Sequence, residues 1–128
     1  MLMKQINEIK FNFYVPMYGT GYFVCRKDIL QNATIISFLG IPEGTCDFIE
    51  DEVSLSIDIF ETIYDYCYNE VCVDINSDNK SWGCSIDFIS NEEIVEEFGE
   101  GKLDYDTFIE VLYSIVNTHA EDLSQYLW

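Results

Sequence analysis

The sequence predicts an α+β protein: a single compact domain over residues 1–128, with two antiparallel β-hairpins, segregated helices and a long C-terminal amphipathic helix. Three observations support this fold class. Several short segments alternate apolar and polar residues with the period of half-buried strands, and others repeat apolar residues at helical spacing. The length of 128 residues fits one domain, and 48% of the residues are hydrophobic, which is enough for a core without disulfides or metals.

The N-terminal third is predicted to form the first hairpin and a short helix. Residues 9–15 alternate and indicate a strand, and a glycine-containing turn at residues 19–21 leads to a returning strand at residues 22–26. Asp28 is placed to cap a helix over residues 29–39. The β-branched residues near the end of that segment leave a strand there as the alternative.

The middle of the chain is predicted to hold a helix that starts at Ser56. Apolar residues from Ile57 to Cys67 recur at helical spacing, and three acidic residues fall on the opposite side. Because residues 53–59 also alternate, a strand over the first half of this segment is the alternative.

The last third is predicted to hold the second hairpin and two more helices. Residues 71–76 and 84–89 alternate and are joined by turn-forming residues. Ser90 and Glu93 have the spacing of a capping box, which predicts a short helix ending before Gly99.

The final helix is predicted to begin at Asp104 or Asp106 and to continue almost to the C-terminus. Its apolar stripe follows helical spacing and ends in the only histidine and a last apolar group. The stripe comprises Phe108, Val111, Leu112, Ile115, Val116, His119, Leu123, Tyr126 and Leu127.

Net charge is the dominant feature of the composition. The chain has 24 acidic residues against 6 basic ones, a net charge of −18. Residues 1–42 carry 2 acids and 4 basic side chains, whereas residues 43–128 carry 22 acids and 2 lysines. Self-repulsion at this charge opposes compaction, so we expect the acidity to serve a purpose beyond folding.

The densest acidic stretch, residues 91–106, has 7 carboxylates among 16 residues. It has three possible interpretations: a solvated helix face, a calcium loop, or a surface for a strongly positive partner. Phe98 and Thr107 stand where the third and twelfth ligands of an EF-hand loop would be, so we do not expect calcium binding. A zinc site built from Cys67, Cys72, Cys84 and His119 lacks a Cys-x-x-Cys pair and is only a weak alternative.

Several classes of function are not expected from this sequence. It contains no P-loop, no G-x-S-x-G and no dinucleotide-binding pattern, so we predict no enzyme activity and no cofactor. With 5 lysines and 1 arginine it should not bind nucleic acid directly. No apolar stretch is long enough to cross a membrane and no signal peptide is evident, which predicts a cytoplasmic protein.

The candidate site is therefore a partner-binding surface with no catalytic and no metal-binding residue. Tyrosines beside carboxylates are typical of interface anchors that face arginines. Two predicted helices supply the acids and one of them the tyrosines: Asp58, Glu61, Asp65, Tyr66 and Tyr68 from the first, and Glu92, Glu93, Glu96, Glu97 and Glu100 from the second.

In composition the chain resembles the small acidic anti-restriction and anti-CRISPR proteins of phages and mobile elements, although it shares no motif with them. The resemblance implies an inhibitor whose carboxylates replace DNA phosphates in the basic surface of a nuclease or another nucleic-acid-binding protein. The alternative is an immunity protein that neutralises a toxin, such as a nuclease. Both hypotheses require a basic protein partner.

Overall fold

One antiparallel sheet of six strands organises the described part of the chain. The computed structural model describes residues 5–15, 19–42, 47–74, 84–98 and 105–127. The strand order is β4-β3-β2-β1-β5-β6, which places β4 and β6 at the two edges. The strands are β1 (Glu8–Val15), β2 (Gly19–Asp28), β3 (Ala33–Pro42), β4 (Ile49–Ser56), β5 (Cys84–Ser90) and β6 (Glu93–Phe98).

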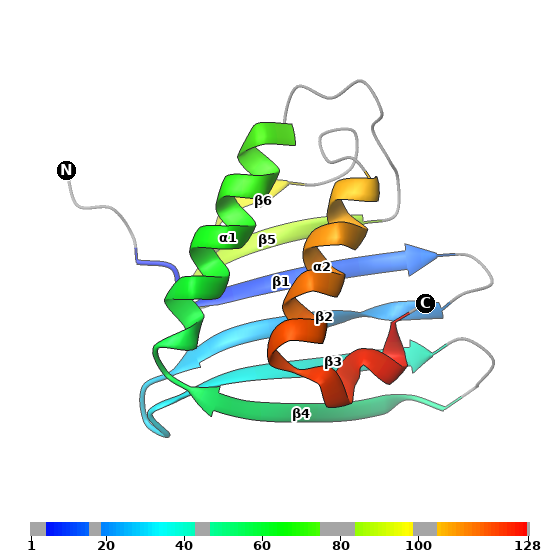
Figure 1. Ribbon diagram of the computed structural model, residues 1–128, viewed down its shortest axis with the longest axis horizontal. Coiled ribbons are helices and arrows are strands. Elements are labelled where there is room, and N and C mark those ends of the chain that lie inside the picture. Colours follow the sequence, from blue (N-terminus) through cyan, green and yellow to red (C-terminus); the bar gives the residue numbers. More distant parts are fainter. Residues whose placement is uncertain (1–4, 16–18, 43–46, 75–83, 99–104, 128) are drawn as a thin grey trace.

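The described helices all lie on one face of this sheet (Figure 1). Helix α1 (Ile59–Asp74) and helix α2 (Tyr105–His119) run side by side across the strands, and a 3-10 helix, η1 (Glu121–Tyr126), follows α2 over β3 and β4. A sheet with helices on one face is an α+β arrangement. The α+β class predicted from the sequence is therefore confirmed.

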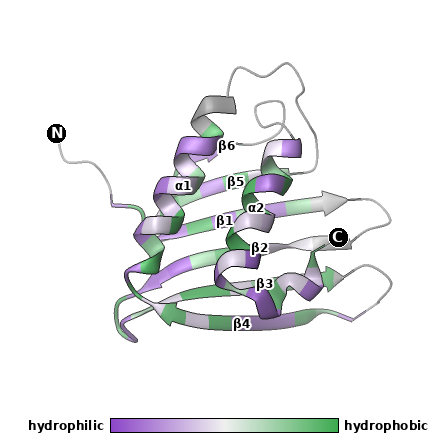
Figure 2. Ribbon diagram, viewed as in Figure 1, coloured by the Kyte–Doolittle hydropathy of each residue, from purple (hydrophilic) through white to green (hydrophobic). Residues whose placement is uncertain are grey.

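The core fills the space between the sheet and the helices. Alternate residues of the strands and the apolar residues of α1 and α2 form one cluster of buried side chains. Figure 2 shows hydrophobic and hydrophilic residues interspersed along the strands and the helices. Burying one large apolar side chain contributes about 1.5–3 kcal/mol, so these residues dominate stability. The fully buried phenylalanines and isoleucines of this core are Phe11, Phe23, Phe38, Phe60, Phe88, Phe108, Ile9, Ile36, Ile63 and Ile86.

The first hairpin forms where the sequence places it, but the helix predicted over residues 29–39 is wrong. That segment is β3, whose residues from Ala33 to Phe38 are all buried and paired with β2 on one side and β4 on the other. A strand buried on both faces loses the polar alternation by which strands are recognised. β-branched residues such as Ile35 and Ile36 also fit a pleated sheet better than a helix.

Asp28 does act as a cap, but for a single turn. Its Oδ1 accepts a hydrogen bond from the backbone N–H of Gln31 at 3.0 Å, which is the geometry expected at a helix start. Asn32 then adopts a φ of 52°, and the chain reverses into β3 instead of continuing as a helix.

The turn between β5 and β6 replaces the predicted capping box. Asn91 and Glu92 have φ values of 50° and 70°, the left-handed pair of a tight hairpin, so Glu93 begins a strand. The helix predicted after Ser90 is therefore wrong. Of its residues, only Phe98 is buried, which is too little for a helix to pack on.

The predicted strand over residues 71–76 is also wrong as far as the structure describes it, because α1 continues to Asp74. The N-cap predicted at Ser56 instead lies in β4, so the strand alternative holds for the start of that segment. The long C-terminal helix is interrupted, since α2 ends at His119 and η1 follows Ala120.

The junction between sheet and helices depends on one buried hydroxyl group. Thr34 of β3 is fully buried, and its Oγ1 donates to the carbonyl oxygen of Ser56 at 2.8 Å. The same oxygen accepts the backbone N–H of Phe60 at 3.1 Å. Thr34 thus satisfies the end of β4 and the first turn of α1 together.

We predict that Thr34→Val destabilises the protein by about 1–3 kcal/mol, because the isosteric side chain can hydrogen-bond neither the carbonyl oxygen of Ser56 nor the buried N–H of Phe60, which keeps only a longer bond of 3.4 Å to the carbonyl oxygen of Ile57. Thr34→Ser is the matched control, since it keeps the hydroxyl and loses only a methyl group. The measurement is the free energy of unfolding in urea. A valine variant as stable as the serine variant would show that this junction does not depend on the hydroxyl.

Candidate functional site: the acidic surface of α1 and β6

The carboxylates predicted to bind a partner are exposed wherever the structure describes them. Asp58 immediately precedes α1, and Glu61 and Asp65 lie on its outer side. Glu92 occupies the β5–β6 turn, whereas the other three described glutamates belong to β6. Those three are Glu93, Glu96 and Glu97. Glu100 lies outside the described residues.

Tyr68 joins the two groups of acids. Its ring packs edge-on against Phe88 and Phe98, with centroids 5.5 Å and 6.4 Å away, which sets α1 against β5 and β6. Its hydroxyl donates a hydrogen bond to Glu96 Oε1 at 3.4 Å. The helix acids and the strand acids, far apart in the sequence, therefore meet at one side of the molecule.

The two tyrosines predicted as partner-binding anchors, Tyr66 and Tyr68, are half-buried. Tyr68 stacks on Tyr64 at 5.7 Å, and Tyr66 packs at the edge of the core. Both lie at the margin of the apolar face of α1, as helical spacing predicts. Tyr68 therefore positions Glu96, and its ring is largely engaged within the fold.

The acids of β6 divide between the two faces of the sheet. Glu96 lies opposite Phe88, on the face covered by the helices, whereas Glu97 lies opposite Asp87, on the other face. The predicted helical ridge of glutamates is therefore replaced by an edge that is acidic on both sides. The acidic surface wraps around this edge of the sheet.

The described basic residues lie on the two central strands, β1 and β2, and Lys27 reaches an acid of this surface. Lys27 on β2 approaches Glu61 at 3.4 Å, and Arg26 forms an ion pair with Asp28 at 2.9 Å. Lys10 on β1 lies 4.2 Å from the centre of the Tyr22 ring. Neither α1 nor β6 contains a lysine or an arginine. Among the described residues, Lys27 of β2 thus pairs with one acid of this surface, Glu61 near the start of α1.

Asp87 is the main feature that sequence reasoning missed. It is only 8% exposed, although it lies on the sheet face that the described helices leave open. Its Oδ2 accepts a hydrogen bond from Asn12 Nδ2 at 3.0 Å, whereas Oδ1 has no partner among the described residues. Burial raises the pKa of this carboxyl, and the charge of Glu97 raises it further. The only signal in the sequence was a polar position in an alternating strand.

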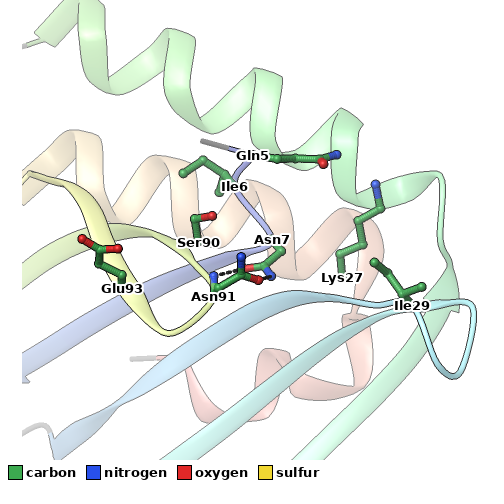
Figure 3. Close-up of a pocket in the computed structure, with 8 residues that line it drawn as sticks. All are labelled: Gln5, Ile6, Asn7, Lys27, Ile29, Ser90, Asn91 and Glu93. Carbon is green, nitrogen blue, oxygen red and sulfur yellow. Dashed lines mark hydrogen bonds between the residues drawn. The ribbon is translucent and has the colours of Figure 1, made fainter. Parts of the chain in front are cut away.

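A shallow cavity of about 310 Å³ lies at one end of the sheet, between the start of β1, the end of β2 and the β5–β6 turn (Figure 3). Two of its polar residues, Asn7 and Asn91, are paired with each other. Asn7 Nδ2 donates to Asn91 Oδ1 at 3.3 Å, and Asn7 Oδ1 accepts the backbone N–H of Asn91. Neither histidine nor cysteine lines the cavity. The pairing of Asn7 with Asn91 therefore holds the β5–β6 turn, which contains Glu92, against the start of β1.

The cysteines whose side chains the structure describes, and the histidine, lie in or near the core. Cys25, Cys67 and Cys84 are buried and outside any disulfide, and burial raises the pKa of the Cys25 thiol to about 12. Burial also lowers the pKa of His119. The structure does not describe the side chain of Cys72.

Two further findings concern metals and membranes. Within the residues that the structure describes, no three His, Cys, Asp or Glu side chains are grouped so that they could hold a metal ion. The loop compared with an EF-hand lies partly outside the described residues, and its described start is the strand β6. Over the same parts of the chain, no helix is long and apolar enough to span a membrane.

Comparison of the chain with protein families, with curated proteins and with solved structures finds no match.

We predict that Asp87→Asn stabilises the protein at pH 7, because the folded state no longer buries a charged carboxylate. The folded pKa of Asp87 is raised, so the parent carboxyl favours folding below its unfolded pKa, near 3.9. That contribution is lost as the pH rises through the folded pKa. The advantage of the variant should therefore shrink on acidification towards about pH 4.

Urea unfolding across this pH range measures the effect. Glu121→Gln is the control, because it removes one negative charge from an exposed position and reports the effect of net charge alone. If the two variants show the same pH dependence, the burial of Asp87 does not contribute.

Proposed function

We propose that this protein is a non-enzymatic inhibitor that binds the basic nucleic-acid-binding surface of a target protein. One observation carries the proposal: the exposed carboxylates of α1 and β6 meet through Tyr68, on two elements without a lysine or arginine. A surface of this kind is complementary to a groove that evolved to hold a polyanion. The activity of the target would be lost because the groove is occupied.

The magnitude of the charge supports mimicry of DNA. Duplex DNA has one charge per about 1.7 Å of its axis, so the same number of charges as the net −18 of this chain spans roughly 31 Å of duplex. A compact chain of 128 residues has a radius of gyration of about 14 Å, hence a diameter of about 35 Å. The protein therefore presents about the charge per unit length of DNA.

The same charge distribution favours a protein partner over other classes of partner. Nucleic acids and anionic membrane surfaces are repelled by the net charge of −18. A basic protein is attracted over long range, which raises the rate of association at low salt. We place this encounter in the cytoplasm, where nucleases that recognise foreign DNA act.

An immunity protein that neutralises a toxin is the second candidate. It is favoured by exposed apolar residues at one end of the acidic surface: Ile29 and Leu30, in the β2–β3 turn, are 73% and 99% exposed and lie near the β5–β6 turn that holds Glu92. An immunity protein can bind outside the nucleic-acid cleft of a nuclease and use such apolar anchors. The two candidates differ in whether nucleic acid competes for the bound target.

The first test of the proposal is capture of the target. We expect an affinity pull-down from the native host at low salt to retain a basic protein that elutes as salt is raised, because several charge pairs break together. Nucleic acid should then compete with this protein for the captured target. A ternary complex of target, nucleic acid and inhibitor would rule out mimicry and favour the immunity protein.

The second test asks which acids make the contact. We predict that neutralising Glu61, Asp65, Glu96 and Glu97 to Gln or Asn lowers affinity for the captured target at least about tenfold, through loss of electrostatic steering. The fold should be retained, because exposed charges contribute little to stability.

A matched variant neutralises four exposed acids of β4 and η1, near the opposite edge of the sheet from β6. They are Glu50, Glu52, Glu121 and Asp122. This variant has the same net charge as the first and should bind several-fold more tightly than it. Equal loss in the two variants would mean that total charge matters and not the surface of α1 and β6.

A further inference from the structure

Strand β6 is a sheet edge with unusual exposure. Among the described strands it pairs only with β5, so the backbone N–H and C=O groups along its outer side lack a strand partner. Its apolar residues Ile94 and Val95 are 51% and 42% exposed. An edge that presents both hydrogen-bonding groups and apolar side chains can accept an additional strand from another chain.

The row of charged side chains that ends at this edge contains more acids than cations. Lys10, Asp87 and Glu97 lie in one row across β1, β5 and β6, on the open face of the sheet. Like charges directly opposite each other on neighbouring strands are destabilising. Asp87 is also the buried carboxyl whose Oδ1 lacks a partner among the described residues. The row therefore begins with a cation and ends with two acids, and a second cation beyond Glu97 would relieve this repulsion.

We propose that an extended segment of the basic partner, bearing lysine or arginine, adds to the sheet along β6 and places a cationic side chain beside Glu97. This inference rests on the proposed function, since it takes the partner to be a basic protein. Backbone hydrogen bonds supply part of the affinity, and the side chain opposite Glu97 supplies the preference for a cation.

Other occupants fit this edge less well. A second copy of the chain would set the glutamates of β6 against one another, and nucleic acid would bring phosphates towards them. A β-bulge also interrupts the pairing near Val95, because Phe88 opposes Glu96 while Ile89 opposes Ile94. Charges and bulges are the means by which edges avoid self-association. Here they disfavour a second copy, and the charges favour a cationic segment.

The opposite edge, β4, is a weaker candidate. Its residues alternate regularly between half-buried and exposed, so its apolar side chains already pack on the core. Asp51 of β4 accepts a hydrogen bond from the Tyr126 hydroxyl at 2.8 Å, which ties this edge to η1. β4 therefore serves as the internal control for β6.

The test uses a synthetic octapeptide that alternates lysine with valine or threonine, with capped ends, at low salt. Its control is the same peptide methylated on every second backbone nitrogen, which keeps the charge but cannot form strand hydrogen bonds on the methylated side. With the full-length protein, hydrogen exchange read by NMR should show at least about tenfold slower exchange of outward-facing β6 amides with the first peptide only.

Two charge reversals locate the contact. Glu97→Lys should weaken peptide binding about tenfold, whereas Glu52→Lys on the same face of β4 should change it less than about twofold. Equal binding of both peptides, or protection at β4, would overturn docking at β6 and leave the proposed function intact. Absence of peptide binding would also overturn it. Failure of the proposed function is detected separately, when nucleic acid does not compete for the captured target.

Discussion

Packing of both helices against a single face of the sheet is the constraint on which the rest of this structure depends. It fixes α1 through its buried side, from Phe60 at the sheet junction to Val71, so that the acids between them must face outward. The hydroxyl of Thr34 sets the point at which α1 leaves the sheet. The path of the helix then brings Tyr68 onto β5 and β6, and with it the two groups of acids.

The high net charge and the apolar core have opposite effects on the stability of the fold. A net charge of −18 disfavours a compact state, whereas the core of phenylalanine and isoleucine side chains favours it. The described cations reduce the repulsion among the acids only near their own positions. Arg26 pairs with Asp28, Lys27 with Glu61, and Lys10 lies over Tyr22, so each serves the central strands. Glu97 at the β6 edge and Glu52 at the β4 edge are exposed, and neither pairs with one of these three cations.

The sequence predicted those parts of the fold in which local pattern and tertiary environment agree. β1, β2 and β5 alternate, and α2 has a clear apolar stripe as far as His119. β3 was mistaken for a helix because burial on both faces removes alternation. The exposure of the surface acids was predictable from the sequence, because a charged side chain stays in solvent whatever the fold packs elsewhere. The face on which each acid lies, and the burial of Asp87, depend on strand pairing. The pairing of Asp87 with Lys10 joins strands far apart in the sequence, and that of Asp87 with Glu97 depends on a hairpin where the pattern indicates a helix.

Residues 92–98, one of the segments whose structure was predicted wrongly, also affect the proposed function most. As a helix, residues 92–98 would set like charges four residues apart, an arrangement that opposes the helix itself. As the edge strand β6, the same segment separates Glu96 and Glu97 onto opposite faces, and the repulsion falls instead between Glu97 and Asp87. A helix would offer a basic groove a single ridge of charge. An acidic strand edge offers charge on both sides and an outer side with no strand partner among the described strands, so a partner that clasps the edge gains more contacts than one that meets a single face.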